Sequence, residues 1–222
     1  MYKLYSMQLS ANSYKVRLML SWTGQPFKLV DVDVIAGESR TPEFLQRNPT
    51  GQVPLLVLPD GRHLPESGAI LYFLAHGTPL LPDEPYARAN VLRWMFFEQH
   101  SHDPFIGQAR FWSRLVRNGR VLKQNLLEEW EDRGYDALRV MDAHLRKAPF
   151  FGNEQPCLAD IALFANTHLA HEGGFDLEPF EGIRDWIGRM SVQERFVPID
   201  WRPPVFMTAG ALPPAPRTEP AA

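Results

Sequence analysis

The sequence contains a single cysteine, Cys157, among its 222 residues. One cysteine excludes an internal disulfide framework, so the chain has to be stabilised by its hydrophobic core. We interpret Cys157 as a buried structural residue rather than a reactive one, because unpaired cysteines usually pack as small apolar side chains. This cysteine usage is consistent with a reducing compartment, and we expect a cytoplasmic protein.

The sequence also lacks an apolar run of the roughly 20 residues that a transmembrane helix requires. Residues 1–6 contain no charged leader followed by an apolar segment, so we expect no secretory signal peptide. The formal net charge is −3, and no basic stripe is present. We therefore expect neither nucleic acid nor a membrane as a partner.

Proline and glycine are concentrated at two places that divide the chain. Residues 77–85 contain three prolines and one glycine, which is typical of a linker. From Pro198 onward the chain contains seven prolines in 25 residues, which predicts an extended tail that Trp201 and Phe206 could anchor in part. With 45% hydrophobic residues, the chain is long enough for two small domains. We predict domains at 1–77 and 86–200, a linker at 78–85 and a tail at 201–222.

The first domain shows strands and helices in alternation. Strand, helix and strand in this order predict a parallel pair with a right-handed crossover. Asp60-Gly61 predicts a hairpin between two short strands that follow. The predicted strands are 2–6, 27–34, 55–58 and 62–64, and the predicted helices are 13–23, 42–47 and a third that begins at Ser67.

The second domain has only helical periodicity. Pro104 falls within the first long helix and predicts a kink near residues 101–105. Asp160 stands three residues after Cys157, where it can accept a hydrogen bond in a capping box. The predicted helices are 86–118, 121–147, 158–171, 180–190 and 192–196.

A candidate binding site lies around the hairpin. Val53-Pro54 immediately precedes the buried strand, where a proline is tolerated. Ser67 is a plausible N-cap of the third helix, and a helix N-terminus with a serine hydroxyl attracts a carboxylate. Glu66 adds a negative charge beside it. A ligand end that carries both a carboxylate and an ammonium, as an amino acid does, would suit both residues.

Gln52-Val53-Pro54 and Glu66-Ser67, together with the segment from Ser10 to Val16, resemble the thioredoxin-like domain of the glutathione transferase family. The resemblance covers about residues 1–200 and is strongest to serine-centred bacterial members of the theta, phi and nu kind. It implies an α/β thioredoxin-like N-terminal domain and an all-α C-terminal helical bundle. It also implies a cis Val53–Pro54 bond, whose valine backbone pairs with the cysteine of glutathione, the co-substrate.

The resemblance further implies roles for individual residues. Glu66 and Ser67 would hold the γ-glutamyl end of glutathione. Gln52 stands where many relatives carry lysine, so its neutral amide would contact the glycine carboxylate. Arg40 either supplies the missing positive charge or is an ordinary solvated arginine.

The candidates for contact with the glutathione sulfur are three residues that follow the first strand: Ser10, Asn12 and Ser13. A thiol of pKa near 8.5 is only a few per cent ionised at neutral pH, and the thiolate is the nucleophile. A donor to the sulfur would lower that pKa by roughly one to two units. Serine and asparagine also favour helix starts for local reasons, so each of the three can instead be a helix cap without a ligand.

In the family, the first helix of the second domain lines the site of the electrophile. Phe105, Arg110, Phe111 and Trp112 are therefore candidates for that site, although core packing also explains aromatic residues here. Asp103 stands where some relatives reach the glutathione of a dimer partner, and we expect a homodimer. His100 and His102 point about 200° apart on a helix, and His168 and His171 could share a metal but have no assigned third ligand, so we predict no metal site.

The resemblance implies a glutathione transferase that attacks an apolar electrophile, as in detoxification. A second hypothesis is a glutathione-dependent disulfide oxidoreductase that works without a protein cysteine. A third is a non-catalytic partner-binding module of the same fold.

Overall fold

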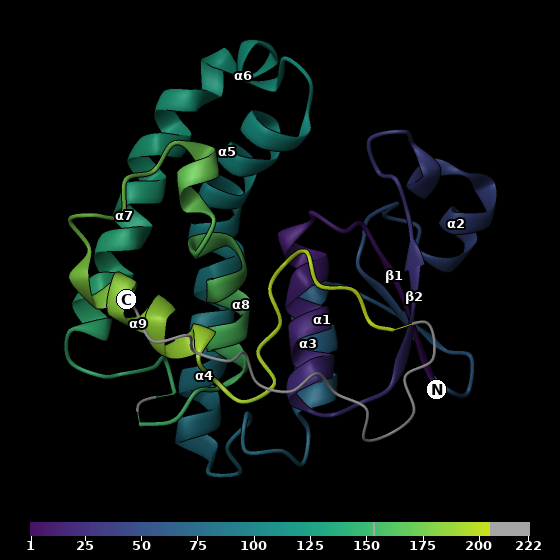
Figure 1. The fold of residues 1–222 in the computed structure, drawn as a ribbon, viewed down its shortest axis with the longest axis horizontal. Helices are drawn as coiled ribbons and strands as arrows, with labels where there is room; N and C mark the ends of the chain where they lie inside the picture. The colour runs from purple at the N-terminus through teal and green to yellow at the C-terminus, as the bar shows by residue number, and fades with distance from the viewer. Residues whose placement is uncertain (153, 205–222) are drawn as a thin grey trace, which may run out of the picture.

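The computed structural model describes residues 1–152 and 154–204. It consists of an N-terminal α/β domain and a larger helical domain that lie side by side (Figure 1). The α/β domain contains β1 (Tyr2–Ser6), α1 (Ala11–Trp22), β2 (Phe27–Asp31), α2 (Pro42–Arg47), β3 (Leu55–Val57), β4 (His63–Pro65) and α3 (Ser67–Ala75). None of the helices in this described part is long and apolar enough to cross a membrane.

The four strands form one mixed sheet in the order β2-β1-β3-β4. β1 and β2 are parallel, with Tyr2 opposite Phe27, as the crossover predicts. β3 runs antiparallel to β1, and the Asp60-Gly61 hairpin returns β4 antiparallel to β3. This sheet and the helical domain beside it confirm the fold class that the sequence predicts.

The two faces of the sheet are covered differently. α1 and α3 lie between the sheet and the helical domain, whereas α2 lies on the far side (Figure 1). Leu4 and Leu56 join Tyr14 of α1 in a core that continues into the helical domain. Phe44 of α2 packs with Leu55 in a second, smaller cluster. The interface between the domains is therefore part of the hydrophobic core.

The first long helix of the helical domain changes its geometry around Pro104. α4 (Pro85–Phe97) is followed by a π-helical segment, Glu98–Gly107, then by α5 (Gln108–Arg110) and a second π-helical segment, Phe111–Leu115. Proline has no backbone N–H and cannot join the ordinary helical ladder. The predicted distortion at residues 101–105 is thus a change of hydrogen-bonding pattern over a longer stretch.

The remaining helices are α6 (Gly119–Leu122), α7 (Leu127–Leu145), α8 (Leu158–Thr167) and α9 (Glu181–Ser191). A short 3₁₀ turn separates α6 from α7, so the predicted helix 121–147 is interrupted near its start. α8 ends at Thr167 and is followed by a separate 3₁₀ turn, Ala170–Gly173. The predicted helix 192–196 is wrong: these residues form turns, and Arg195 has a φ of 64°.

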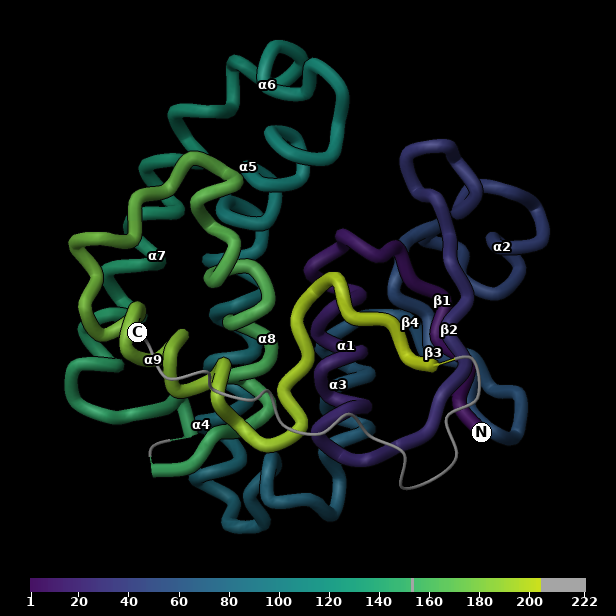
Figure 2. The backbone as a smooth tube through the Cα atoms, viewed as in Figure 1, coloured from purple at the N-terminus to yellow at the C-terminus, as the bar shows by residue number. Residues whose placement is uncertain are grey.

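After α9 the chain returns to the N-terminal domain along α1, as the yellow end of the tube shows (Figure 2). The buried Tyr14 hydroxyl donates to the Val197 carbonyl oxygen at 2.7 Å. The Arg17 guanidinium donates to the carbonyl oxygens of Gln8 and Ile199, and burial lowers the pKa of Arg17 to about 10. Trp201 packs against Phe27. The predicted second anchor, Phe206, and the tail from 205 to 222 lie outside the described residues.

Tyr14→Phe is expected to lower the free energy of unfolding by about 1–2 kcal/mol, because the Val197 carbonyl loses its buried donor. Chemical denaturation measures the change. Tyr86→Phe is the control, since Tyr86 is 80% exposed. Equal stability of the two variants would contradict a contribution of this contact.

Candidate functional site

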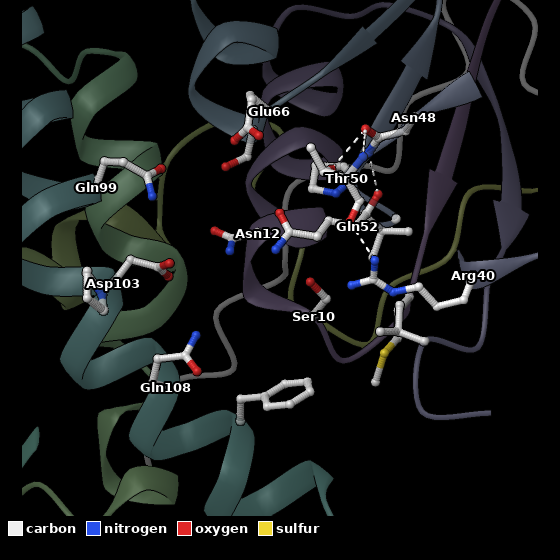
Figure 3. A pocket seen from close by; sticks show the side chains of 18 of the residues that line it. Ser10, Asn12, Arg40, Asn48, Thr50, Gln52, Glu66, Gln99, Asp103 and Gln108 are labelled. Carbon is white, nitrogen blue, oxygen red and sulfur yellow. Dashed lines mark hydrogen bonds between the residues drawn. The ribbon is translucent and has the colours of Figure 1, made fainter. Parts of the chain in front are cut away.

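A cavity of about 600 Å³ opens between the two domains. This volume is within the range of roughly 300–1,000 Å³ that is usual for small-molecule sites. Figure 3 shows labelled residues of both domains facing each other across it. The residues that line it are Met7, Ser10, Asn12, Val34, Arg40, Asn48, Thr50, Gly51, Gln52, Val53, Pro54, Glu66, Ser67, Gln99, Asp103, Pro104, Gln108, Phe111 and Trp112.

The loop before β3 is shaped by a buried asparagine. Asn48 donates from its side chain to the Gln52 carbonyl oxygen at 2.9 Å and accepts from the backbone N–H of Thr50 at 3.2 Å. The Val53–Pro54 peptide bond that follows is cis. Both residues line the cavity. Sequence reasoning had assigned no role to Asn48; its place between helix α2 and a turn is ordinary for asparagine and gave no sign of burial.

The N-terminus of α3 reaches the cavity at Glu66 and Ser67. Glu66 is the N-cap residue, and the helix begins at Ser67, so the prediction of Ser67 as N-cap is wrong by one position. Glu66 has a φ of 70°, a conformation that non-glycine residues rarely adopt. Such strained backbone occurs preferentially at ligand sites. Its side chain accepts no hydrogen bond from the N–H groups of the first turn.

Arg40 and Gln52 lie on the same side of the cavity (Figure 3). The Arg40 guanidinium donates to the Thr50 carbonyl oxygen at 3.0 Å. It also lies so close to Gly51 that a Cβ there would stand 2.7 Å from Arg40 Nη1. Gly51 has a φ of 60°, which favours glycine over other residues, and the nearby Arg40 side chain leaves no room for a Cβ atom. One positive charge and one amide are thus available to an anionic ligand end.

Ser10 lines the cavity and is also the N-cap of α1. Its Oγ accepts a hydrogen bond from the Ser13 N–H at 3.2 Å. Because the cap uses only an oxygen lone pair, the hydroxyl hydrogen remains available for another acceptor. The two interpretations of Ser10, a helix cap and a donor to a ligand, are compatible in this geometry.

Asn12 and Ser13 are placed differently. Asn12 lines the cavity, and its Oδ1 accepts a hydrogen bond from Lys15 Nζ at 2.6 Å. Ser13 has no exposed surface and is absent from the cavity wall. The structure therefore brings Ser10 and Asn12 together at the site, and it places the Ser13 hydroxyl in the interior.

The wall on the side of the helical domain comes from one face of the helix around Pro104. Asp103 accepts a hydrogen bond from Asn166 Nδ2 at 2.6 Å, and the absence of a side chain at Gly107 leaves room for both groups. Sequence reasoning had not singled out Gln99 and Gln108, although they follow the same face. The contact of Asp103 with the glutathione of a dimer partner stays a prediction.

Of the four residues predicted for the electrophile site, two line this cavity, one lines a smaller pocket that shares Ser10 and Asn12 with it, and one packs against the core. Phe111 and Trp112 line it, with their rings in edge-to-face contact at 5.7 Å. Phe105 packs against the hydrophobic core. Arg110 is buried and donates to Glu172 Oε2 at 2.8 Å and to the Leu9 carbonyl oxygen at 2.9 Å.

Arg110 thereby connects the helical domain with the loop that leads into Ser10. Burial lowers the pKa of its guanidinium, and Glu172 opposes that effect. The sequence showed an arginine beside two aromatic residues but not its ion-pair partner 62 positions away.

Cys157 is 2% exposed and lies outside the cavity wall. Burial raises the pKa of its thiol, which makes it a poor nucleophile. In residues 1–152 and 154–204 no three metal-binding side chains gather in one place.

Two family models match the chain, one in the N-terminal domain and one in the helical domain. Residues 4–81 match the glutathione S-transferase N-terminal domain, and residues 124–189 match the glutathione S-transferase C-terminal domain. A solved structure of a possible glutathione S-transferase from Rhodopseudomonas palustris is 51% identical, with a TM-score of 0.89, over 91% of this chain and 99% of that one. The chain belongs to the glutathione S-transferase family.

The relatives of this chain carry names that describe different activities. The maleylacetoacetate isomerase of Rhizobium meliloti strain 1021 is 31% identical over 78% of this chain and 84% of its own. The disulfide-bond oxidoreductase YfcG of Escherichia coli K12 is 28% identical over 81% and 85%. A glutathione transferase family member from Pseudomonas fluorescens Pf-5, solved with two glutathione molecules bound, is 26% identical, with a TM-score of 0.75, over 87% and 89%.

Proposed function

We propose that this protein is a glutathione transferase that binds glutathione in the cavity between the domains and uses its thiolate to attack an electrophile. The observation that carries the proposal is the meeting of two sets of residues in that one cavity. Ser10 and Asn12 of the first loop and helix line it together with Val53, Pro54, Glu66 and Ser67. The family membership and the glutathione-bound relative support the choice of ligand.

Glutathione would lie extended across this wall. Its α-ammonium pairs with Glu66, and its α-carboxylate accepts from Ser67 and the N-terminus of α3. The backbone of Val53 pairs with the cysteine residue of the tripeptide. Arg40 and Gln52 take the glycine carboxylate, an assignment that their position on the same side supports.

The sulfur then points toward the start of α1. The bound thiol loses its proton to solvent, and Ser10 and Asn12 donate hydrogen bonds to the thiolate. The thiolate forms a bond to an electrophilic carbon, and the leaving group departs with the electron pair of the broken bond. Stabilising the thiolate increases its concentration at neutral pH.

The second substrate has an apolar body, which packs on Phe111 and Trp112. Gln99 and Gln108 stand on the same wall, so their amides are available for a polar substituent.

The chain forms a cytoplasmic homodimer in this proposal. Tyr72 and Phe73 on α3 and Phe96 on α4 are large apolar side chains exposed to solvent, and exposed apolar groups of this kind support a dimer.

Ser10→Ala tests the mechanism. The pH midpoint of glutathione conjugation is expected to rise by about one to two units, because the thiolate loses a donor worth roughly 1.5–3 kcal/mol. The measurement is the pH dependence of kcat/KM for an aryl halide electrophile, with glutathione at a saturating concentration. Ser191→Ala on α9 is the control, and its profile is expected to match the wild-type profile. An unchanged midpoint in Ser10→Ala would remove Ser10 from the mechanism.

Reduction of a disulfide by glutathione is a second candidate, and the similarity to YfcG favours it. In that reaction the thiolate attacks a disulfide sulfur, and a second glutathione completes the exchange. Comparing turnover of a disulfide with turnover of an aryl halide separates the two activities. Failure to bind glutathione at millimolar concentration would instead favour a non-catalytic partner-binding module.

A further inference from the structure

A buried ion pair lies directly behind the cavity wall. Lys15 of α1 is 1% exposed, and Glu98 of the π-helical segment is 2% exposed. Lys15 Nζ stands 2.6 Å from Glu98 Oε1. The same ammonium also contacts Asn12 Oδ1 at 2.6 Å. One buried cation thus connects the helical domain to a residue that lines the cavity.

This contact determines which end of the Asn12 amide faces the ligand. An ammonium has donors and no acceptor, so only the carbonyl oxygen of Asn12 can accept from Lys15. The NH₂ group then points away from Lys15. Figure 3 shows Asn12 beside the open space between Ser10 and Gln99. The two N–H donors are therefore available to a ligand in the cavity.

We propose that Lys15 is a positioning residue: its ammonium, paired with Glu98 of the other domain, holds the Asn12 amide with its N–H donors toward the sulfur of bound glutathione. This inference rests on the proposed function and adds to it the pair that orients the donor. A hydrogen bond from a cation to the amide oxygen also polarises the amide and strengthens its N–H groups as donors.

Glu98 makes the buried ammonium tolerable. A buried charge without a partner is strongly unfavourable, and the carboxylate balances it at close range. Burial raises the pKa of Glu98 to about 7, with Lys15 opposing and Asp103 adding to the rise. The other titratable neighbour is His102, which burial keeps neutral by lowering its pKa to about 3. His102 faces Thr167, with Nε2 at 2.9 Å from Oγ1, and thus adds no charge to the pair.

The decisive experiment measures the pKa of the bound glutathione thiol, from the ultraviolet absorbance of the thiolate across pH. Lys15→Met alone leaves Glu98 buried without a partner, so Lys15→Met/Glu98→Gln serves as the neutral variant. In both variants the thiol pKa is expected to rise by about one unit, which corresponds to a roughly tenfold loss of thiolate below that pKa. The KM for glutathione is expected to stay within about threefold, since the residues that bind its two ends are unchanged.

A double-mutant cycle separates positioning from general structural support. In an Asn12→Ala background, Lys15→Met is expected to produce no further rise in the thiol pKa, because the group that it positions is gone. Lys147→Met, at an exposed lysine after α7, is the control and is expected to leave the pKa unchanged.

Additive shifts for Asn12→Ala and Lys15→Met would overturn the positioning role, as would a normal thiol pKa in the neutral double variant. If the wild-type protein binds glutathione without lowering its thiol pKa, the inference fails while glutathione binding stands. If the wild type binds no glutathione, the proposed function and this inference fail together.

Discussion

Replacing Asp160 with alanine is expected to lower the free energy of unfolding by about 3–5 kcal/mol. Asp160 has no exposed surface, and its carboxylate accepts from three buried donors. These are the backbone N–H groups of Phe151 and Cys157, at 2.9 and 2.8 Å, and the indole N–H of Trp186 at 2.9 Å. Alanine leaves all three donors unpaired in the core.

The same carboxylate is expected to make the free energy of unfolding depend on pH. Burial raises the pKa of Asp160, and the three hydrogen bonds only partly oppose that effect. A raised pKa in the folded state means that stability decreases as the pH rises from the ordinary carboxyl range through the folded-state pKa. Asp160→Asn removes this dependence, but its NH₂ group must face at least one of the donors.

Urea denaturation at several pH values measures both effects. Asp185→Ala is the matched control, because Asp185 is exposed on α9 of the same domain. We expect that change to stay within about 0.5 kcal/mol of the wild type. An Asp160→Ala variant as stable as this control would show that the capping box contributes little to the fold.

Local sequence signals were sufficient for much of the α/β domain. The bounds of β1 and α2 agree with their predictions, since alternation and a Thr41-Pro42 helix start are encoded within a few residues. The hairpin at Asp60-Gly61 is local in the same way. β2 ends at Asp31 rather than at residue 34, where apolar residues continue into a loop without a strand partner.

Other features depend on contacts between distant residues, which a sequence pattern does not contain. Pro104 predicted a distortion, but the π-helical geometry depends on how the freed backbone groups pack in the helical domain. Val192 continues the apolar pattern of a helix, yet α9 ends at Ser191, and the chain beyond it contacts α1 through the hydrogen bond from Ser21 to the Arg195 carbonyl oxygen. The hydrogen bond from Tyr14 to Val197 spans 183 positions.

The candidate site likewise contains some residues that local sequence motifs predict and others that depend on distant partners. The Val53–Pro54 and Glu66–Ser67 motifs lie in one continuous stretch and were recognisable from sequence. The orientation of Asn12 depends on Lys15 and through it on Glu98, which is 83 positions from Lys15. Arg110 was predicted to add a positive charge near the electrophile, and its ion pair with Glu172, 62 positions away, has no signal in the sequence. Side chains that act through distant partners are thus the part of the site that sequence patterns did not reveal.

Glu66→Gln is expected to raise the KM for glutathione by about 10- to 100-fold, because the pairing of a carboxylate with the ligand ammonium is worth roughly 1.5–3 kcal/mol. Glutamine keeps the length and shape of the side chain at this strained position, where φ is 70°. The substitution therefore changes the charge and little else.

Steady-state kinetics over a wide range of glutathione concentrations measures the effect. At saturation, kcat is expected to stay within about threefold of the wild type, since Glu66 binds the amino-acid end and not the sulfur. Glu43→Gln is the matched control, because Glu43 is an exposed glutamate of α2 whose ion pair with Arg47 lies in solvent. A fall in kcat with an unchanged KM would mean that Glu66 acts on the transition state, and the γ-glutamyl end would then have to bind elsewhere in the cavity.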